Sequence, residues 1–442
     1  MKIAFITLGC PKNLVDTEVM LGLLADEGHE FTPEAGEADT IIVSTCSFIS
    51  AAVQESRGVV DQCLALKADG AVRHVVVAGC LPQRYGAATW GMFPGVDAVV
   101  GCSDFEKIVE VVRQVESDAS VFSVGVPEAL YDDSSPRVLG TPGHIAYVKI
   151  ADGCDNRCAY CVIPSIRGAL RSRTPESVIR EVANLAESGV REVNLIAQDT
   201  TAYGTDIAPD VTLPALLSAL ADTGVPWIRV LYTHPAHVTD ELLSVMSGLE
   251  PVVPYLDMPI QHISDRVLAA MGRGTDGEHI RSLISRVREA VPGVSIRSSV
   301  MVGFPDETDA EFQELLAFVR QGNVDHLGVF EYSPEPGTPA FSLPGRIEAE
   351  TASVRARAII ETMEGLTEAR GQNMIGREVT ILIDSSGSAE EGRPAVGRTS
   401  GQAWEMDGEV LVEPDDQSPA EGDFARVKVT GVAGFDLTAR IA

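Results

Sequence analysis

Three closely spaced cysteines, Cys154, Cys158 and Cys161, have the clearest chemical meaning in this sequence. They have the spacing C-x3-C-x2-C and come directly after an apolar run, 145–150, that is typical of a strand. Three such thiolates can hold three irons of a cubane cluster, and no fourth cysteine or histidine follows nearby. One iron would therefore keep an open position for another ligand. Structural zinc is disfavoured, because it usually takes four ligands in two C-x2-C pairs.

Three more cysteines follow strand-like runs in the first third of the chain. They are Cys10 after 3–8, Cys46 after 40–44 and Cys80 after 74–78. Helical patterns over 16–28 and 51–67 separate the runs, which predicts an alternating α/β unit with a parallel sheet. Because parallel strands end at one edge of a sheet, we expect the three thiols to converge and to hold a second cluster.

The two remaining cysteines have less certain roles. Cys102 also follows an apolar run, 96–101, so it is either a bystander or an alternative ligand of the second cluster. Cys63 lies within a helical pattern and is expected in the core, where free cysteine is common.

A turn-rich connector leads into a long stretch that alternates strand and helix six times. The expected strands are 145–150, 192–196, 228–231, 255–260, 295–302 and 326–330, and helices are expected at 175–187, 265–271 and 307–321. Six such units predict a partial, six-stranded version of a TIM-like barrel.

Polar side chains follow most of these strands. They are Gln198 and Asp199, His234, Gln261 and His262, and Glu331 and Tyr332. The C-terminal face of a barrel carries its function, so these residues are candidates for cofactor and substrate contacts. Ordinary polar capping of strand ends is the alternative.

The last segment changes to a period of two residues. Alternating patterns over 378–384, 409–412, 424–430 and 435–441 predict a small antiparallel β-barrel. Residues 375–442 contain 6 basic and 13 acidic side chains, a net charge of −7. This balance favours a basic protein as partner over a nucleic acid.

The whole chain has the same charge bias, with 64 acidic against 34 basic residues and a net charge of −30. Such a surface repels phosphate backbones and attracts basic partners. We expect a cytoplasmic protein, because neither a leader nor an apolar membrane span is apparent. Eight cysteines then suit metal ligation better than disulfides.

The C-x3-C-x2-C motif, with Tyr160 directly before its third cysteine, resembles the signature of the radical S-adenosylmethionine enzymes. The resemblance implies a 4Fe-4S cluster at Cys154, Cys158 and Cys161 that binds S-adenosylmethionine and cleaves it to a 5′-deoxyadenosyl radical. Residues 8–18, together with Cys46 and Cys80, look like the N-terminal domain of the methylthiotransferases, which have two 4Fe-4S clusters. Within residues 8–18, Cys10 is followed by Pro-Lys-Asn. This form is similar to that of the RimO branch of the family, which modifies a ribosomal protein.

Three further segments resemble parts of the same family. Residues 195–204 look like the motif that receives the amino group of S-adenosylmethionine, which implies contacts from Gln198 and Asp199, although the common Gly-Gly-Glu form is absent. Residues 301–308, with Gly303, resemble the loop along the nucleoside, and Gln261 is a further expected cofactor contact. The C-terminal module resembles the TRAM domain, often an RNA-binding element.

We therefore expect an α/β chain in four parts. They are an open parallel α/β methylthiotransferase domain at 1–128, a linker at 129–144, a radical S-adenosylmethionine barrel at 145–372 and a TRAM-like β-barrel at 373–442.

The resemblance implies a methylthiotransferase with two 4Fe-4S clusters and S-adenosylmethionine. It would modify the β-carbon of an aspartate in small-subunit ribosomal protein twelve, with flavodoxin or ferredoxin as reductant. One alternative is a transfer-RNA adenosine methylthiotransferase. Another is a non-catalytic iron–sulfur or zinc protein that acts as a scaffold or RNA binder.

Overall fold

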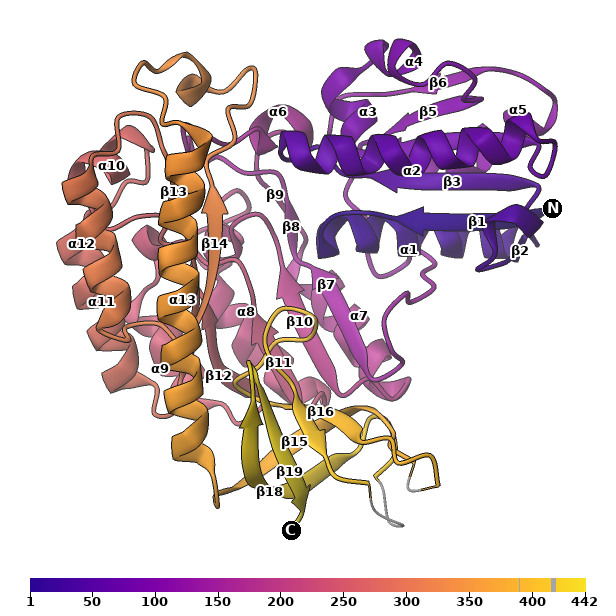
Figure 1. Cartoon of the computed structure of the whole chain (residues 1–442). Helices are drawn as coiled ribbons and strands as arrows, with labels where there is room; N and C mark the ends of the chain where they lie inside the picture. The colour runs from indigo at the N-terminus through magenta and orange to yellow at the C-terminus, as the bar shows by residue number, and fades with distance from the viewer. Residues whose placement is uncertain (389, 415–418) are drawn as a thin grey trace.

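The computed structural model describes residues 1–388, 390–414 and 419–442, arranged as two six-stranded sheets and a small closed β-barrel (Figure 1). The N-terminal sheet lies beside the upper end of the central one, and the closed barrel lies below it in this view. No helix in the described part of the chain is long and apolar enough to cross a membrane.

The N-terminal sheet has the order β2-β1-β3-β4-β5-β6, and every strand pair is parallel. Its strands are β1 (Lys2–Thr7), β2 (Glu30–Phe31), β3 (Thr40–Thr45), β4 (His74–Gly79), β5 (Ala98–Gly101) and β6 (Val121–Ser123). Its helices are α1 (Pro11–Asp26), α2 (Ser50–Ala68), α3 (Cys80–Tyr85), α4 (Ala88–Met92) and α5 (Ile108–Glu116). The expected start of α1 at Asp16 is wrong, because Pro11 occupies the first helical position, where its missing N–H costs nothing.

The central sheet is the expected partial barrel, with the parallel order β14-β13-β12-β11-β10-β7. Its strands are β7 (Ile145–Lys149), β10 (Glu192–Ile196), β11 (Trp227–Val230), β12 (Val252–Asp257), β13 (Ser295–Val302) and β14 (His326–Glu331). The strand expected at 255–260 ends at Asp257, because Pro259 has no N–H and Gln261 has a φ of 70°. A short pair, β8 (Ala151–Asp152) and β9 (Arg171–Ser172), flanks the cysteine loop.

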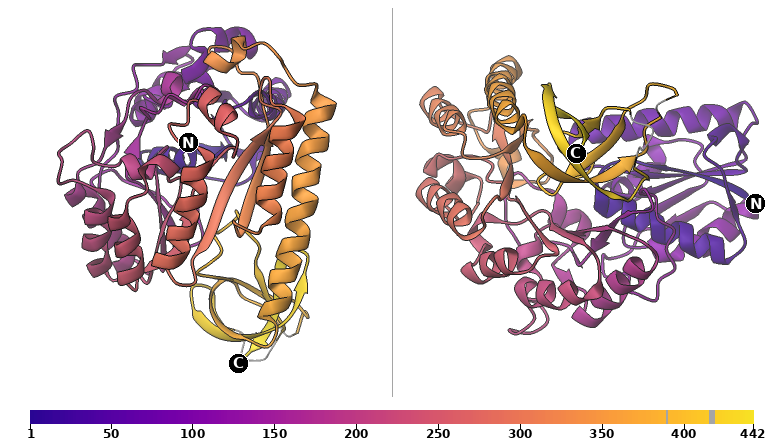
Figure 2. Two further views of the ribbon diagram at one scale, coloured as in Figure 1. Left: turned by 90° about the vertical axis from the view of Figure 1, so that its left-hand side faces the viewer. Right: turned by 90° about the horizontal axis from the view of Figure 1, so that it is seen from below.

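Helices cover the outside of the central sheet. They are α7 (Pro175–Glu187), α8 (Leu213–Leu220), α9 (Asp240–Gly248), α11 (Gly277–Ala290) and α12 (Asp309–Arg320). The short helices α6 (Ile163–Arg167) and α10 (Asp265–Ala270) lie instead at the upper end of the barrel (Figure 1). Seen from below, the magenta to orange helices form an arc around the sheet (Figure 2). The starts of α7 and α12 are capped by Thr174 and Thr308, the latter in a capping box with Glu311.

The long helix α13 (Ala349–Met374) packs along β14 and leads to the closed barrel (Figure 1). The barrel has the order β15-β16-β17-β19-β18, with β15 (Glu378–Ser385), β16 (Ala395–Thr399), β17 (Val410–Val412), β18 (Phe424–Ala433) and β19 (Asp436–Ile441). It differs from the expectation in two respects. The β17–β19 pair is parallel rather than antiparallel. Strand β16 was not predicted, because Gly397 and the buried Arg398 interrupt its alternation of apolar and polar residues.

A buried ion network joins this barrel to the starts of the central strands. Glu192, the first residue of β10, accepts hydrogen bonds from Arg229 at 2.8 Å and from Arg398 at 2.8 Å. All three side chains are at most 1% exposed. Burial acts to raise the pKa of Glu192, but the charges of Arg229 and Arg398 outweigh it and hold that pKa at about 2.

The loop at 400–407 continues this contact into the central sheet. Arg229 donates to the Ser400 carbonyl at 2.7 Å, and the Tyr255 hydroxyl donates to Asp407 at 2.6 Å. The Trp404 ring lies 6.3 Å from the ring of Tyr147. The N-terminal ends of the strands are therefore covered by the C-terminal barrel, and their C-terminal ends are left for chemistry.

Replacing Glu192 by Gln should destabilise this junction by about 3–5 kcal/mol, because two buried guanidinium groups lose their shared counter-charge. Urea unfolding followed by tryptophan fluorescence should show a lower midpoint for Glu192→Gln. Since the Glu192 pKa is depressed from 4.5 to about 2, its stabilisation is complete above pH 4.5 and is lost as the pH falls toward 2. The difference between wild type and variant should shrink over that window.

The matched control is Arg180→Ala, which removes an exposed ion pair with Asp133. Exposed pairs contribute at most about 1 kcal/mol, so its unfolding midpoint should stay near that of the wild type. Equal midpoints for the two variants would contradict the role given to Glu192.

Candidate active site

The loop of Cys154, Cys158 and Cys161 begins directly after β8, at a position that only glycine can occupy. Gly153 has a φ of 80°, and a Cβ there would lie 1.9 Å from the Ala169 carbonyl oxygen. The Cys154 N–H donates to the Gly168 carbonyl at 3.1 Å, which holds the start of the loop. The loop is thereby folded back, and Cys154 and Cys158 lie close enough for their charges to act on the Cys161 thiol.

The three thiols fit a three-cysteine cluster site. Burial, and then the nearby charges of Cys158 and Cys154, raise the pKa of the Cys161 thiol to about 12. Two N–H groups point at the sulfurs: Arg273 donates to Cys158 at 3.4 Å, and the Ile163 backbone donates to Cys161 at 3.4 Å. A bound cluster takes up the thiolate charge, and such N–H···S bonds help to set its potential.

The second triad forms at the C-terminal edge of the N-terminal sheet, where the sequence predicts it. Thr45 and Gly79 are register partners in β3 and β4, so Cys46 and Cys80 follow adjacent strand ends. Gly9 brings Cys10 to them, because a Cβ on Gly9 would lie 3.1 Å from the Cys46 sulfur. Burial, together with the charges of Cys80 and Cys10, raises the pKa of Cys46 to about 11. This donor set also fits a cluster with three thiolate ligands.

Cys102 lies beside Cys80, because their preceding residues, Gly79 and Gly101, are register partners in β4 and β5. A hydrogen bond from Cys102 is the main factor that lowers the pKa of Cys80, to about 6. Cys102 itself is 5% exposed and packs with Cys80. Cys63 lies in the core, as expected, at 2% exposure.

One short helix connects the two triads. Helix α6 begins two residues after Cys161, and its last residue, Arg167, donates to the Cys80 sulfur at 3.4 Å. Ile166 in the same helix packs against Cys80 and Cys102. Val162, which precedes the first residue of α6, packs into the same cluster, so the short helix, which rises only about 7 Å, lies between the two triads.

A cavity of about 480 Å³ opens beside the first triad. It is lined by Cys154, Asp155, Asn156, Leu170, Asp199, Thr201, Ala202, Thr205 and His237. Asp199 accepts from Asn156 at 2.7 Å and pairs with Nδ1 of His237 at 2.9 Å. The hydrogen bond to Asp199 raises the pKa of His237, whereas burial lowers the pKa of His234 to about 3. The cavity has the size of a cofactor site.

The four residues expected to contact the cofactor have different surroundings. Asp199 lines the cavity, whereas Gln198 donates to the Asp152 carboxylate at 2.7 Å. Gln261 follows β12 and bridges to Val300, outside the lining of this cavity. The left-handed Gly303 (φ 75°) lies against helix α13, where a Cβ would come within 2.7 Å of a side chain.

Sequence reasoning did not single out Asn156 and His237 as part of this cavity. Asn156 lies inside the cysteine motif, where its partners are not apparent from spacing. His237 follows His234 by three residues in a short 3₁₀ turn, Pro235–His237. Two histidines three residues apart, directly after a barrel strand, could have indicated that His237 belongs to the site.

Three family models match the chain in sequence. They are the uncharacterized protein family UPF0004 at residues 2–101, the radical SAM superfamily at 148–319 and the TRAM domain at 375–442. Among solved structures, the radical S-adenosylmethionine methyltransferase TsrM from Kitasatospora setae covers 77% of this chain, and the match covers 73% of TsrM. The TM-score is 0.57 at 15% identity, which shows a shared fold.

Curated relatives match over the full length. The ribosomal protein uS12 methylthiotransferase RimO of Solibacter usitatus is 42% identical over 99% of this chain and 94% of the relative. Its namesake from Geobacter sulfurreducens is 41% identical over 100% of this chain and 98% of the relative. Together with the radical SAM fold and the cysteine loop, these matches show that the chain belongs to the RimO family of radical S-adenosylmethionine methylthiotransferases.

Proposed function

We propose that this enzyme adds a methylthio group to the β-carbon of an aspartate in small-subunit ribosomal protein uS12. The observation that carries the proposal is the pair of cysteine triads joined by helix α6. The names of the RimO relatives supply the ribosomal protein, and the aspartate comes from the resemblance to that family.

The two triads would hold one 4Fe-4S cluster each. When bound, the cluster at Cys154, Cys158 and Cys161 would supply a radical from one S-adenosylmethionine that abstracts hydrogen, and the second cluster would hold the sulfur that another S-adenosylmethionine methylates. The protein's own contribution is placement. Arg273 and Arg167 direct N–H groups at one sulfur of each triad, and α6 keeps the triads a short, constant distance apart.

For S-adenosylmethionine we propose a position in the cavity beside Cys154. Asp199 would accept a hydrogen bond from the amino group, with Asn156 and His237 orienting its carboxylate. Gln198 is held by Asp152 and would support the same loop. Gln261 and Gly303, after the neighbouring strands, would be further contacts of S-adenosylmethionine.

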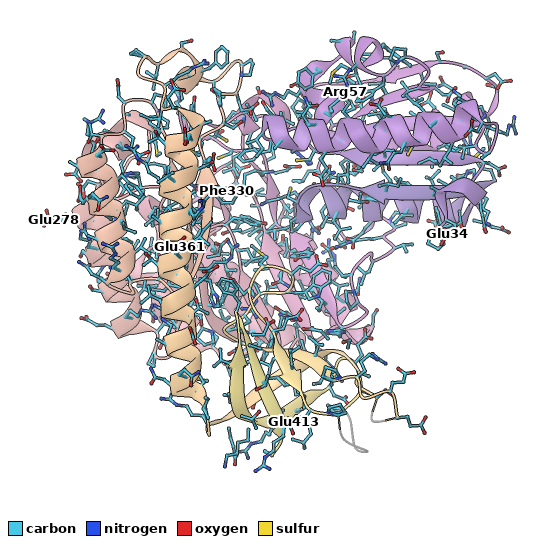
Figure 3. All side chains as sticks on the ribbon, in the orientation of Figure 1. Glu34, Arg57, Glu278, Phe330, Glu361 and Glu413 are labelled. Carbon is cyan, nitrogen blue, oxygen red and sulfur yellow. The ribbon has the colours of Figure 1, made fainter. Side chains whose placement is uncertain are left out.

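Charge supports a protein partner rather than transfer RNA. Acidic residues lie on the outside of all three parts, as Glu34, Glu278 and Glu413 show (Figure 3). Two acidic residues of the C-terminal module, Asp415 and Asp416, lie outside the described residues. A basic ribosomal protein would be attracted to this surface, and flavodoxin or ferredoxin would be the electron donor.

Iron and sulfide analysis of reconstituted protein should give about eight irons per chain in the wild type. Triple alanine replacement of Cys10, Cys46 and Cys80 should leave about four, and so should triple replacement of Cys154, Cys158 and Cys161. The Cys63→Ala variant is the control and should keep the full iron content, because Cys63 lies in the core. Iron that disappears from both sites in either triple variant would contradict two separate clusters.

Mass spectrometry of uS12 from a strain that lacks this gene should show loss of a CH2S increment on one aspartate. Complementation with the wild type should restore the increment, and complementation with Cys154→Ala should not, because the first cluster would lose a ligand. An increment that persists in the deletion strain would reject the proposal. Loss of a methylthio nucleoside from transfer RNA, with uS12 unchanged, would favour the transfer-RNA alternative.

A further inference from the structure

Lys12 is a buried amine placed between the N-terminal sheet and the central barrel. It belongs to the first turn of α1, two residues after Cys10, and is 7% exposed. Its Nζ lies 2.9 Å from the centre of the Tyr232 ring. Tyr232 follows β11 at the C-terminal end of the barrel strands, so the amine points away from its own sheet toward the barrel's functional face.

The Lys12 ammonium lacks an anionic partner within the described part of the chain. No acceptor there hydrogen-bonds to its Nζ, and no carboxylate forms an ion pair with it; its contact is the Tyr232 ring. Lys149 and Arg167 are equally buried nearby, yet each contacts two carboxylates. An unpaired buried charge costs several kcal/mol, of which a cation–π contact offsets about 2.

The neighbouring carboxylate with the strongest influence on Lys12 is already engaged. Asp257 accepts a hydrogen bond from the Tyr232 N–H at 2.9 Å and pairs with Arg297 at 3.5 Å. Cys10, the other group with a strong influence, is exposed and belongs to the second triad. Neither group pairs directly with the Lys12 Nζ, so no carboxylate of the described residues fills the counter-ion position at this amine.

We propose that Lys12 binds the side-chain carboxylate of the target aspartate and so selects aspartate as the residue to be modified. The inference rests on the proposed function, since it names the group that recognises that substrate. A carboxylate on Nζ would place the aspartate Cβ, one bond from the carboxyl carbon, within about 5 Å of the amine. The reacting carbon would then lie beside Cys10 and face the barrel.

This geometry discriminates against close relatives of aspartate. Asparagine has the same shape but no charge, so it would leave the buried ammonium without a counter-ion. Glutamate would move its β-carbon one bond further from the amine, about 1.5 Å from the position that aspartate reaches. Lys12 is thus a specificity-determining residue of the reaction.

The test uses the full-length reconstituted enzyme with uS12 and with uS12 in which the target aspartate is replaced by asparagine. The methylthio product is quantified by mass spectrometry. Lys12→Met keeps the length of the side chain and removes its charge. It should lower kcat/KM on wild-type uS12 by about 10- to 100-fold and abolish most of the preference for aspartate over asparagine.

Two controls separate recognition from structure. Lys107→Met makes the same substitution at an exposed position of the N-terminal part and should keep both rate and preference. Lys12→Arg keeps the positive charge and should keep the preference for aspartate even where the rate falls. This variant also serves as the test if Lys12→Met does not fold.

An unchanged preference in Lys12→Met, or a lost preference in folded Lys12→Arg, would overturn the assignment. The assignment also fails if Lys12→Met loses iron from the second triad or shifts its potential while the preference for aspartate stays intact. Activity of the wild-type enzyme distinguishes a failure of the proposed function from a failure of the role proposed for Lys12. No product on uS12 contradicts the proposed function and the Lys12 role together, whereas product with an unchanged preference in Lys12→Met contradicts the Lys12 role only.

Discussion

Four buried charges hold the two halves of the active site together. Asp16 comes from α1, Lys149 ends β7, Asp152 ends β8 and Arg167 ends α6, and none is more than 3% exposed. Arg167 reaches Asp16 at 2.6 Å and Asp152 at 3.0 Å, and Lys149 contacts the same two carboxylates. Each buried ion loses several kcal/mol of hydration, so the four are stable only as a complete set in this one arrangement.

The quartet also determines how the cluster loops face each other. Arg167 donates to Cys80 of the second triad, and Asp152 accepts from Gln198 near the first. Although burial acts to raise the pKa of Asp152, the charges of Lys149 and Arg167 hold it well below its usual range, so the carboxylate stays ionised. The placement of the two cysteine triads relative to each other thus depends on these paired charges as well as on helix α6.

The opposite end of the barrel is closed by a second buried network, that of Glu192, Arg229 and Arg398. The C-terminal module is therefore attached to the starts of the strands, away from the thiols. The acidic surface of this module, where Glu413 lies, is at the far end of the barrel from the cysteine loops (Figure 3). The cysteine loops lie at the other end, where the N-terminal sheet and the barrel meet.

Local patterns in the sequence predicted most of the regular elements, and the metal ligands that they indicate stay a prediction. The period-two run at 295–302 and the helical pattern at 175–187 match β13 and α7, and cysteines directly after strands converge because parallel strands share an edge. Strand β16 was missed because Arg398 is buried by ion pairs with residues far away in the chain. Lys12 and Asp16 lie in the segment that resembles the methylthiotransferases, but their sequence positions did not show that they or Lys149 are buried charges. A charge is paired or left unpaired only by neighbours that the tertiary fold supplies. Residue type and spacing thus determined where the cysteines fall relative to the strands, and long-range packing decided how the two triads are joined and which buried charges are paired.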